Sequence, residues 1–142
     1  MTSRESMETT LVLLKPDAVR RSLMAEIIGR FERRGFHFRG LRLLQLDRAM
    51  AETHYAEHSE RPFFGELVDF ITSGPIVALA LEGEGAVLAV REMMGKTNPL
   101  DSAPGTIRGD LALLMGENII HGSDSTESAE RELAIYFPDG LL

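Results

Sequence analysis

Apolar segments of two different periods alternate along this chain, and their alternation is the feature that most constrains its fold. Residues 9–14 and 76–81 are largely apolar runs of strand length, whereas residues 24–31 place apolar side chains at helical spacing. The run 76–81 is apolar on both faces, so we expect it at the centre of a sheet. Strands and helices that interleave in this way predict an α+β sandwich with helices on one face of the sheet.

The remaining elements are predicted from turn and capping signals. Gly35 is the expected stop of the first helix, and residues 36–46 alternate but change phase near Gly40, as a bulged strand does. Asp124, with Glu127 three residues later, has the spacing of a capping box and is predicted to begin the last helix. We predict further elements as helices at 47–59, 64–71, 86–94 and 124–135, a short strand at 119–120, and a long loop at 98–109.

Composition and charge limit the class of protein. A chain of 142 residues without cysteine predicts one domain over residues 1–142, with no disulfide and no thiolate chemistry. The formal net charge of −7 argues against general nucleic-acid binding, although a small anion can still bind locally. The apolar run 76–81 is far shorter than the roughly 18 residues of a membrane span, so we expect a cytoplasmic protein without a membrane partner.

Two familiar motifs are incomplete. Residues 83–85 begin like a dinucleotide-binding fingerprint, but Leu88 occupies the third glycine position, and a loop before a helix is the favoured interpretation. His54 and His58 are four residues apart, a spacing that can hold zinc. No third ligand is evident in the sequence, so a solvated helix face is the favoured interpretation of these histidines.

His121 lies in the most informative segment of the chain. It follows two isoleucines and precedes Gly-Ser-Asp-Ser, so we expect it where a strand ends and a helix begins. Exposed N–H groups at a helix start favour an anion, and a neutral imidazole there could attack phosphorus and hold a phosphoryl group. From its position alone, a structural histidine at a strand end is an equally good interpretation.

Glu132 favours the chemical interpretation. Helical spacing places its carboxylate on the apolar face of the last helix, where a charge needs a partner. A histidine just before the helix is a suitable one, because a carboxylate can fix the orientation and tautomer of the ring. A salt bridge to an arginine elsewhere is the alternative.

Three cations from distant segments could together bind a polyphosphate. Arg91 shares a helix side with apolar residues, Lys15 ends the first strand, and Arg108 lies in the long loop that also begins near Thr97. Each alone is typically a solvated charge, but together at the ends of elements they suit phosphate. Because Arg108 has no evident core role, we expect Arg108→Ala to lower turnover far more than stability.

Six short blocks resemble those of nucleoside diphosphate kinases, in the same order and spacing. They are Lys-Pro-Asp-Ala at 15–18, Arg-Pro-Phe-Phe at 61–64, Ser-Gly-Pro at 73–75, Thr-Asn-Pro at 97–99, Pro-Gly-Thr-Ile-Arg-Gly-Asp at 104–110 and Asn-Ile-Ile-His-Gly-Ser-Asp-Ser at 118–125. The last block is the most specific. The resemblance runs from about residue 9 to residue 137, and the short C-terminal end is similar to that of bacterial members.

The resemblance implies a ferredoxin-like sandwich, in which helices cover a four-stranded antiparallel sheet. It also implies ping-pong transfer of the γ-phosphoryl group from a nucleoside triphosphate, mainly ATP, to a nucleoside diphosphate with any base. His121 would carry the phosphoryl group, and Glu132 and Ser123 would orient its ring. Mg²⁺ would bridge the nucleotide phosphates without a protein cage. The implied assembly is a homo-oligomer, first a tetramer and second a hexamer.

Further residues take nucleotide contacts from the resemblance. The phosphates would be contacted by Tyr55, Arg91, Thr97 and Arg108. Lys15 and Asn118 would reach the ribose hydroxyls, and Lys15 would also reach the phosphate end and so belong to the catalytic set. Phe63 would stack on the base, with Met115 on its other side.

Two alternatives stay open at this point. One is a non-catalytic nucleotide-binding or regulatory module on the same fold, against which the intact His121, Glu132 and Lys15 argue. The other is a protein-histidine phosphotransfer domain that acts on a protein aspartate. Such domains are usually helical bundles, so the strands predicted at 9–14 and 76–81 argue against it.

Overall fold

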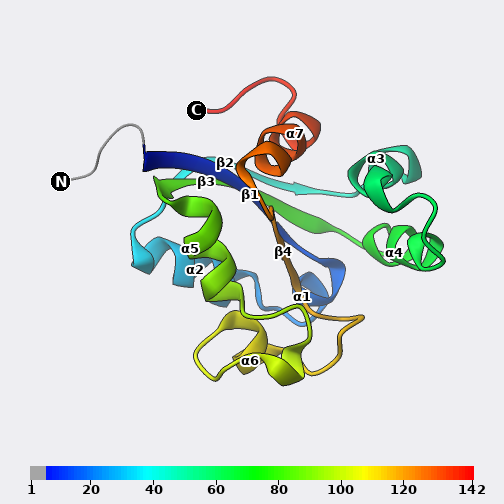
Figure 1. The fold of residues 1–142 in the computed structure, drawn as a ribbon, viewed down its shortest axis with the longest axis horizontal. Coiled ribbons are helices and arrows are strands. Elements are labelled where there is room, and N and C mark those ends of the chain that lie inside the picture. Colours follow the sequence, from blue (N-terminus) through cyan, green and yellow to red (C-terminus); the bar gives the residue numbers. More distant parts are fainter. Residues whose placement is uncertain (1–5) are drawn as a thin grey trace.

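A four-stranded antiparallel sheet organises the chain, as the computed structural model of residues 6–142 shows (Figure 1). Its spatial order is β2-β3-β1-β4, and every neighbouring pair is antiparallel. The strands are β1 (Met7–Leu14), β2 (His37–Leu44), β3 (Ile76–Glu84) and β4 (Ile120–Gly122). This sheet and its helices confirm the predicted ferredoxin-like α+β fold, and the run 76–81 lies in a central strand as expected. Residues 1–5, which the single-domain prediction includes, lie outside the described residues.

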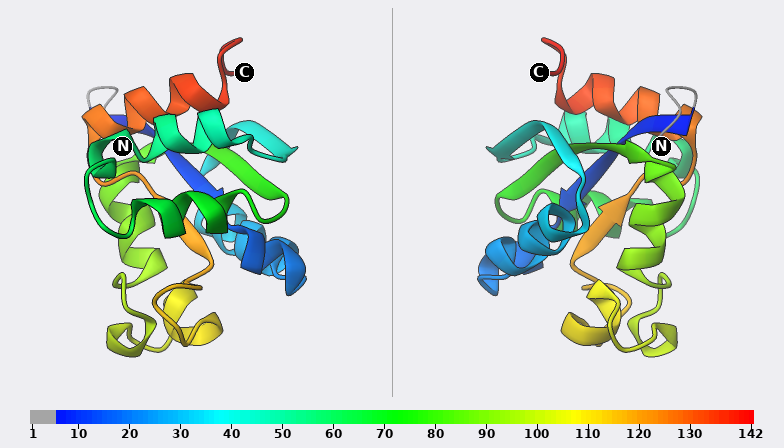
Figure 2. Two further views of the ribbon diagram at one scale, coloured as in Figure 1. Left: turned by 90° about the vertical axis from the view of Figure 1, so that its right-hand side faces the viewer. Right: turned by 90° about the vertical axis from the view of Figure 1, so that its left-hand side faces the viewer.

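Helices cover both faces of the sheet, so the prediction of helices on one face alone is wrong. On one face, Val12 and Leu79 pack with α2 (Met24–Arg34) and α5 (Ala86–Met94). On the other face, Leu11 and Ala78 pack with α3 (Arg48–His54), α4 (Phe64–Ile71) and α7 (Thr126–Tyr136). Figure 2 shows α7 and α2 on opposite sides of the sheet. Because the central strands β1 and β3 are apolar at successive positions, both faces need a cover.

Glycine determines two features that the sequence predicted correctly. Gly35 ends α2 with a φ of 103°, a left-handed conformation that glycine adopts without a steric cost. The register of β2 against β3 shifts between Phe38 and Gly40, which confirms the predicted bulge. A Cβ atom at Gly40 would lie 2.6 Å from the Phe137 ring, so a side chain there would displace the aromatic cover of this face.

Several short helices differ from the predictions. The sequence analysis missed α1 (Pro16–Arg20), which proline at its first position favours. The predicted helix over 47–59 is α3 followed by a separate 3-10 helix (Ala56–His58), and the predicted loop over 98–109 holds a 3-10 helix (Pro99–Asp101) and the start of α6 (Ile107–Leu111). The side chains of Asn98 and Thr106 cap these last two helices. Within residues 6–142, no helix combines the length and the apolarity needed to cross a bilayer.

The N-cap of α7 is Ser125, so the predicted capping box that starts at Asp124 is wrong. The Ser125 hydroxyl accepts a hydrogen bond from the Ser128 N–H at 3.0 Å. Serine and aspartate are similarly good N-caps, and two such residues in succession leave the sequence ambiguous by one position.

Candidate active site

A cleft of about 290 Å³ lies where β4 and the ends of β1 and α5 meet α3 and α7. Its walls hold eight of the eleven side chains that the sequence analysis proposed for the site. These eight are Lys15, Tyr55, Arg91, Thr97, Arg108, Asn118, His121 and Glu132. The fold thus gathers residues that are up to 117 positions apart in the sequence around one hollow.

His121 lies within β4, opposite Leu13 of β1, and not between the end of a strand and a helix as the sequence predicted. Its flanking residues Ile120 and Gly122 are buried, while the His121 ring borders the cleft. This alternation follows from strand geometry, because successive side chains point to opposite faces. A Cβ atom at Gly122 would lie 2.5 Å from the Met94 sulfur, so glycine lets β4 pack closely on α5.

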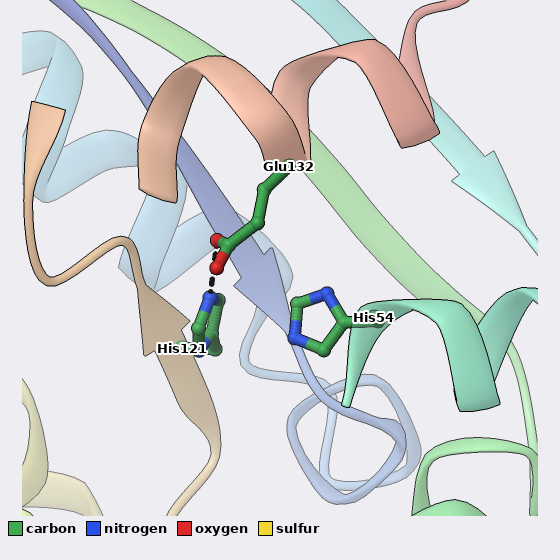
Figure 3. Close-up of side chains that lie close together, drawn as sticks. All are labelled: His54, His121 and Glu132. Atoms are coloured by element: carbon green, nitrogen blue, oxygen red, sulfur yellow. Dashed lines mark hydrogen bonds and ion pairs between the residues drawn. The ribbon is translucent and has the colours of Figure 1, made fainter. Parts of the chain in front are cut away.

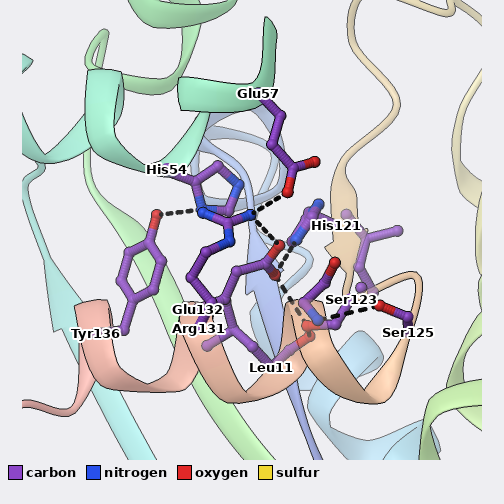
Figure 4. A network of polar contacts seen from close by, with 12 residues as sticks. Leu11, His54, Glu57, His121, Ser123, Ser125, Arg131, Glu132 and Tyr136 are labelled. Atoms are coloured by element: carbon purple, nitrogen blue, oxygen red, sulfur yellow. Dashed lines mark hydrogen bonds and ion pairs between the residues drawn. The ribbon is translucent and has the colours of Figure 1, made fainter.

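Glu132 and His121 form the pair that the sequence analysis predicted. His121 Nε2 lies 2.8 Å from Glu132 Oε1 (Figure 3). The Ser123 hydroxyl donates to the same oxygen at 2.9 Å (Figure 4). Ser123 is fully buried and does not border the cleft, so within the described residues it acts through Glu132. Burial raises the pKa of Glu132, but the hydrogen bonds from His121 and Ser123 outweigh this, and the pKa lies below its usual value.

This contact fixes the tautomer of the ring. An ionised carboxylate only accepts hydrogen bonds, so His121 Nε2 must carry the proton in the neutral imidazole. The lone pair is then on Nδ1, which is the nucleophilic nitrogen of the ring. The carboxylate also stabilises the positive charge that develops on the ring when Nδ1 attacks an electrophile.

Ile119, two residues before His121, has a strained backbone. Its φ of 64° lies in the left-handed region, which a β-branched residue rarely adopts and which costs roughly 1–3 kcal/mol. Two hydrogen bonds hold it there: the Lys15 N–H donates to Ile119 O at 2.8 Å, and the Ile119 N–H donates to Asp17 Oδ2 at 3.1 Å. The strained turn leads directly into β4 and therefore determines where His121 emerges. The sequence analysis assigned no role to Asp17.

Arg108 is a buried structural residue as well as a lining residue of the cleft. Its guanidinium donates to Ile120 O at 2.6 Å, Asn118 O at 3.3 Å and Gly95 O at 3.4 Å. The side chain is 5% exposed, so the expectation that Arg108 has no core role is wrong. Burial and the nearby charge of Arg91 lower the pKa of Arg108 to about 10, which leaves it charged at neutral pH.

Replacing Arg108 by alanine therefore reduces stability as well as turnover. Three carbonyl groups lose a charged donor, and we expect the free energy of unfolding to fall by about 2–4 kcal/mol. Urea unfolding of Arg108→Ala beside Arg34→Ala, which removes an exposed arginine on α2, measures this change. Equal midpoints for the two variants would show that the carbonyl contacts do not stabilise the fold.

Lys15, Asn118 and Thr97 form a chain of hydrogen bonds along one wall. Lys15 Nζ donates to Asn118 Oδ1 at 2.7 Å, and Asn118 Nδ2 donates to Thr97 O at 3.0 Å. Burial and the charge of Arg108 lower the pKa of Lys15 to about 8, against the opposing effect of Asp17. Arg91 donates to the carbonyl of Gly122, the residue after His121, at 3.1 Å, so a further cation lies near the nucleophile.

The aromatic residues proposed for the site lie at different depths. Tyr55 borders the cleft, and burial raises the pKa of its phenol to about 12. Phe63 is 43% exposed and packs beside His58, with ring centroids 5.8 Å apart. Met115 is 60% exposed, and neither Phe63 nor Met115 borders the cleft as the described residues define it.

His54 is a site residue that the sequence analysis missed. Its side chain is 4% exposed, so the interpretation as a solvated helix face is wrong for His54. Its Nδ1 lies 3.1 Å from the Tyr136 hydroxyl, and its ring stands edge to face with that of His121, with centroids 4.8 Å apart. Burial lowers the pKa of His54 to about 3, so its ring is neutral at ordinary pH.

A second missed residue, Arg131, links the Glu132 carboxylate to Glu57 in the 3-10 helix that follows α3. Its guanidinium lies 3.5 Å from Glu57 Oε1 and 3.5 Å from Glu132 Oε2 (Figure 4). In the sequence, Arg131 is one of many arginines. Only the packing of α7 against the segment after α3 distinguishes it from the others.

Comparison with known proteins identifies the family. A family model described as "Nucleoside diphosphate kinase" matches residues 8–141. The chain belongs to the nucleoside diphosphate kinase family. The nucleoside diphosphate kinases of Gloeobacter violaceus and Deinococcus radiodurans are 62% and 60% identical to it over 136 residues, which is 96% of this chain and 91% and 99% of theirs.

A solved structure agrees with this assignment. The nucleoside diphosphate kinase from Halobacterium salinarum, in complex with CDP, has a TM-score of 0.92 and 46% identity, and the match covers 95% of this chain and 91% of that one. The kinase family confirms the predicted activity, transfer of the γ-phosphoryl group from a nucleoside triphosphate to a nucleoside diphosphate. It does not favour the non-catalytic module or the protein phosphotransfer domain.

Proposed function

We propose that the kinase activity of this chain proceeds through a phosphohistidine on Nδ1 of His121. The observation that supports it is the 2.8 Å contact between His121 Nε2 and the buried Glu132 carboxylate, in a cleft that four cationic side chains border. The contact leaves Nδ1 as the ring nitrogen with a free lone pair. No proton has to leave this nitrogen before it attacks.

Two displacement steps make up the proposed reaction. In the first, the Nδ1 lone pair forms a bond to the γ-phosphorus, the bond to the bridging oxygen breaks, and the nucleoside diphosphate leaves with that electron pair. In the second, a terminal phosphate oxygen of another nucleoside diphosphate attacks the phosphorus, and the P–N bond returns its electron pair to Nδ1. Each step exchanges one high-energy phosphorus bond for another, so the reaction runs in both directions.

The residues around His121 stabilise the charge that moves during transfer. Phosphoryl transfer depends mainly on positioning and electrostatics, because charge spreads over the equatorial oxygens. We propose that Arg91, Arg108 and Lys15 hold the phosphates, with Thr97 and Tyr55 as hydroxyl donors. The Glu132 carboxylate stabilises the positive charge that develops on the His121 ring, and the hydrogen bond from Ser123 holds Glu132 in place.

The base and the sugar bind farther out. We propose that Asn118 and Lys15 contact the ribose and that Phe63 and Met115, both partly exposed, stack on the base. Stacking accepts every base because each has a π-face, so the enzyme should use purines and pyrimidines alike. The CDP bound in the Halobacterium salinarum structure is one such pyrimidine nucleotide.

The divalent cation that such nucleotide kinases use is, in our proposal, Mg²⁺ held mainly by the nucleotide. Mg²⁺ prefers six oxygen ligands and usually keeps several waters. Within residues 6–142, the one compact group of three metal-ligating side chains contains two histidines, which do not suit Mg²⁺. The exposed Asp124 carboxylate at the cleft fits a contact through such a water. When bound, the ion neutralises the phosphate oxygens.

The wider setting of the enzyme stays a prediction. We propose that residues 1–142 act as one kinase domain in the cytoplasm and that the chain forms a homo-oligomer, a tetramer before a hexamer. In this proposal the chain binds nucleoside di- and triphosphates and further copies of itself. Light scattering of the purified protein measures the mass directly, and a monomer at assay concentration would contradict the assembly.

The state of Lys15 predicts a basic limit to nucleotide use. With a pKa of about 8 in the free enzyme, Lys15 loses its charge as the pH rises through 8, and the cleft loses one phosphate-binding cation. We expect kcat/KM for the diphosphate to fall above pH 8, while kcat at saturation changes less. The pH profile of Lys15→Met, which has no charge to lose, should be flat over this range at a lower level. A profile with the same basic limb in Lys15→Met would assign the limb to another group.

Initial-rate kinetics test the proposed function as a whole. A ping-pong enzyme gives parallel lines in double-reciprocal plots when ATP is varied at several fixed concentrations of diphosphate. We expect parallel lines and comparable rates with GDP, CDP and UDP. Intersecting lines would indicate direct transfer within a ternary complex and would contradict the phosphohistidine.

A further inference from the structure

We propose that His54, His121 and Glu132 form a zinc-binding site in this kinase. One potential ligand atom from each residue lies within 4.8 Å of the others, in the wall of the cleft (Figure 3). Two imidazole nitrogens and one carboxylate oxygen are a known ligand set for Zn²⁺, with a fourth position left for water. The transfer that we derive above gives His54 no step, so this site explains a buried histidine that the kinase reaction does not use.

The geometry needs a closure to hold an ion. Zn–N and Zn–O bonds of about 2.0–2.2 Å place tetrahedral donors about 3.3–3.6 Å apart, and the present ligand atoms lie within 4.8 Å of one another. The His54 imidazole therefore has to move by roughly an ångström, into the cleft that it borders. The hydrogen bond between His121 Nε2 and Glu132 Oε1 is replaced, because both atoms bind the ion and the Nε2 proton is released to solvent.

The outer contacts of His54 and Glu132 already suit such a site. In Figure 3, the His54 nitrogen nearer to His121 is Nε2, which leaves Nδ1 for the Tyr136 hydroxyl at 3.1 Å. The Ser123 hydroxyl at 2.9 Å and the Arg131 guanidinium at 3.5 Å hold the two oxygens of Glu132. Ligating histidines and carboxylates nearly always have such partners, which orient them toward the ion.

The site selects among metals by its donors. Zn²⁺ accepts nitrogen ligands readily, whereas Mg²⁺ prefers oxygen and octahedral geometry, so millimolar Mg²⁺ should not compete. Zinc also occupies Glu132 and the ring that carries the phosphoryl group. We therefore expect it to inhibit the kinase, a consequence that rests on the proposed function of His121.

Calorimetry with zinc chloride tests the binding without reference to activity. We expect the wild-type chain to bind one Zn²⁺ per subunit in the presence of Mg²⁺, and His54→Phe to lose at least tenfold in affinity. His37→Gln, which removes an exposed histidine on β2, is the matched control and should bind as the wild type does. Equal zinc affinity in wild type and His54→Phe would overturn the proposal.

Phosphoenzyme labelling at buffered free zinc separates this proposal from the proposed function. We expect zinc to lower the labelling rate in the wild type and in His37→Gln, and to lower it less in His54→Phe, each relative to the same variant without zinc. If zinc does not change the labelling rate of the wild type, the proposed inhibition by zinc is wrong, and the proposed phosphohistidine is unaffected. Absence of labelling without zinc would contradict the phosphohistidine instead, while calorimetry would still decide the site.

Discussion

His121→Gln should lose at least about 10⁴-fold in kcat for transfer from ATP to a diphosphate, because no other described group in the cleft can take its place. The other side chains of the cleft include cations, hydroxyls and carboxylates. Of its two other histidines, His54 is buried and hydrogen-bonded to Tyr136, and the ring of His58 packs beside Phe63 instead of pairing with Glu132. Nucleotide affinity should stay within about threefold, since the phosphate-binding cations remain.

Coupled assays of ATP and GDP exchange measure the turnover, and calorimetry with ADP measures the affinity. His37→Gln on the outer strand β2 controls for the loss of a histidine and should retain wild-type turnover. If His121→Gln exchanged phosphate at a rate near that of the wild type, the nucleophile would be another group. Loss of ADP binding together with turnover would show that the variant disturbs the cleft and not the carrier alone.

Glu132→Gln should lower kcat by about 10²–10⁴-fold while the fold and the nucleotide affinity are kept. Glutamine has the size of glutamate but presents an N–H₂ group, which can donate to His121 Nε2 and so move the ring proton to Nδ1. The nucleophilic nitrogen would then be protonated. The charge that stabilises the developing imidazolium is lost as well, although Ser123 can still hold the amide.

Single-turnover labelling with γ-labelled ATP resolves this effect from product release. We expect the phosphorylation rate to fall in Glu132→Gln and to stay unchanged in Glu130→Gln, an exposed carboxylate on the same helix. An NMR measurement of the His121 ring nitrogens should show the proton moving from Nε2 to Nδ1. A wild-type labelling rate in Glu132→Gln would show that the carboxylate does not position the nucleophile.

Sequence patterns predicted this fold well where local and global preferences agree. The central strand at 76–81, the helix ended by Gly35 and the bulge near Gly40 each have a signal within a few residues. The run 76–81 could also have predicted helices on both faces of the sheet, because a strand that is apolar on both faces must be covered on both. The short helices were missed because their stability comes from caps and packing, such as the Thr106 side chain at the start of α6.

The site was predictable to a different extent at different residues. Glu132 was found because a carboxylate on an apolar helix face needs a partner, and the structure supplies His121 at 2.8 Å. Arg108 was misjudged because three backbone carbonyls, which no sequence pattern shows, surround it. Asp17 and His54 act through contacts with residues 102 and 82 positions away, Ile119 and Tyr136. Such long-range pairs become visible only when the chain is folded.

Labelling of the intact enzyme with γ-labelled ATP, in the absence of diphosphate, tests the central claim most directly. We predict one labelled group per active site on His121, stable in alkali and lost in acid, that leaves the protein as labelled GTP or UTP when GDP or UDP is added. Peptide mapping should place the label within residues 118–125. An enzyme that turns over in the exchange assay but never carries label, or that carries it on another residue, would contradict the account.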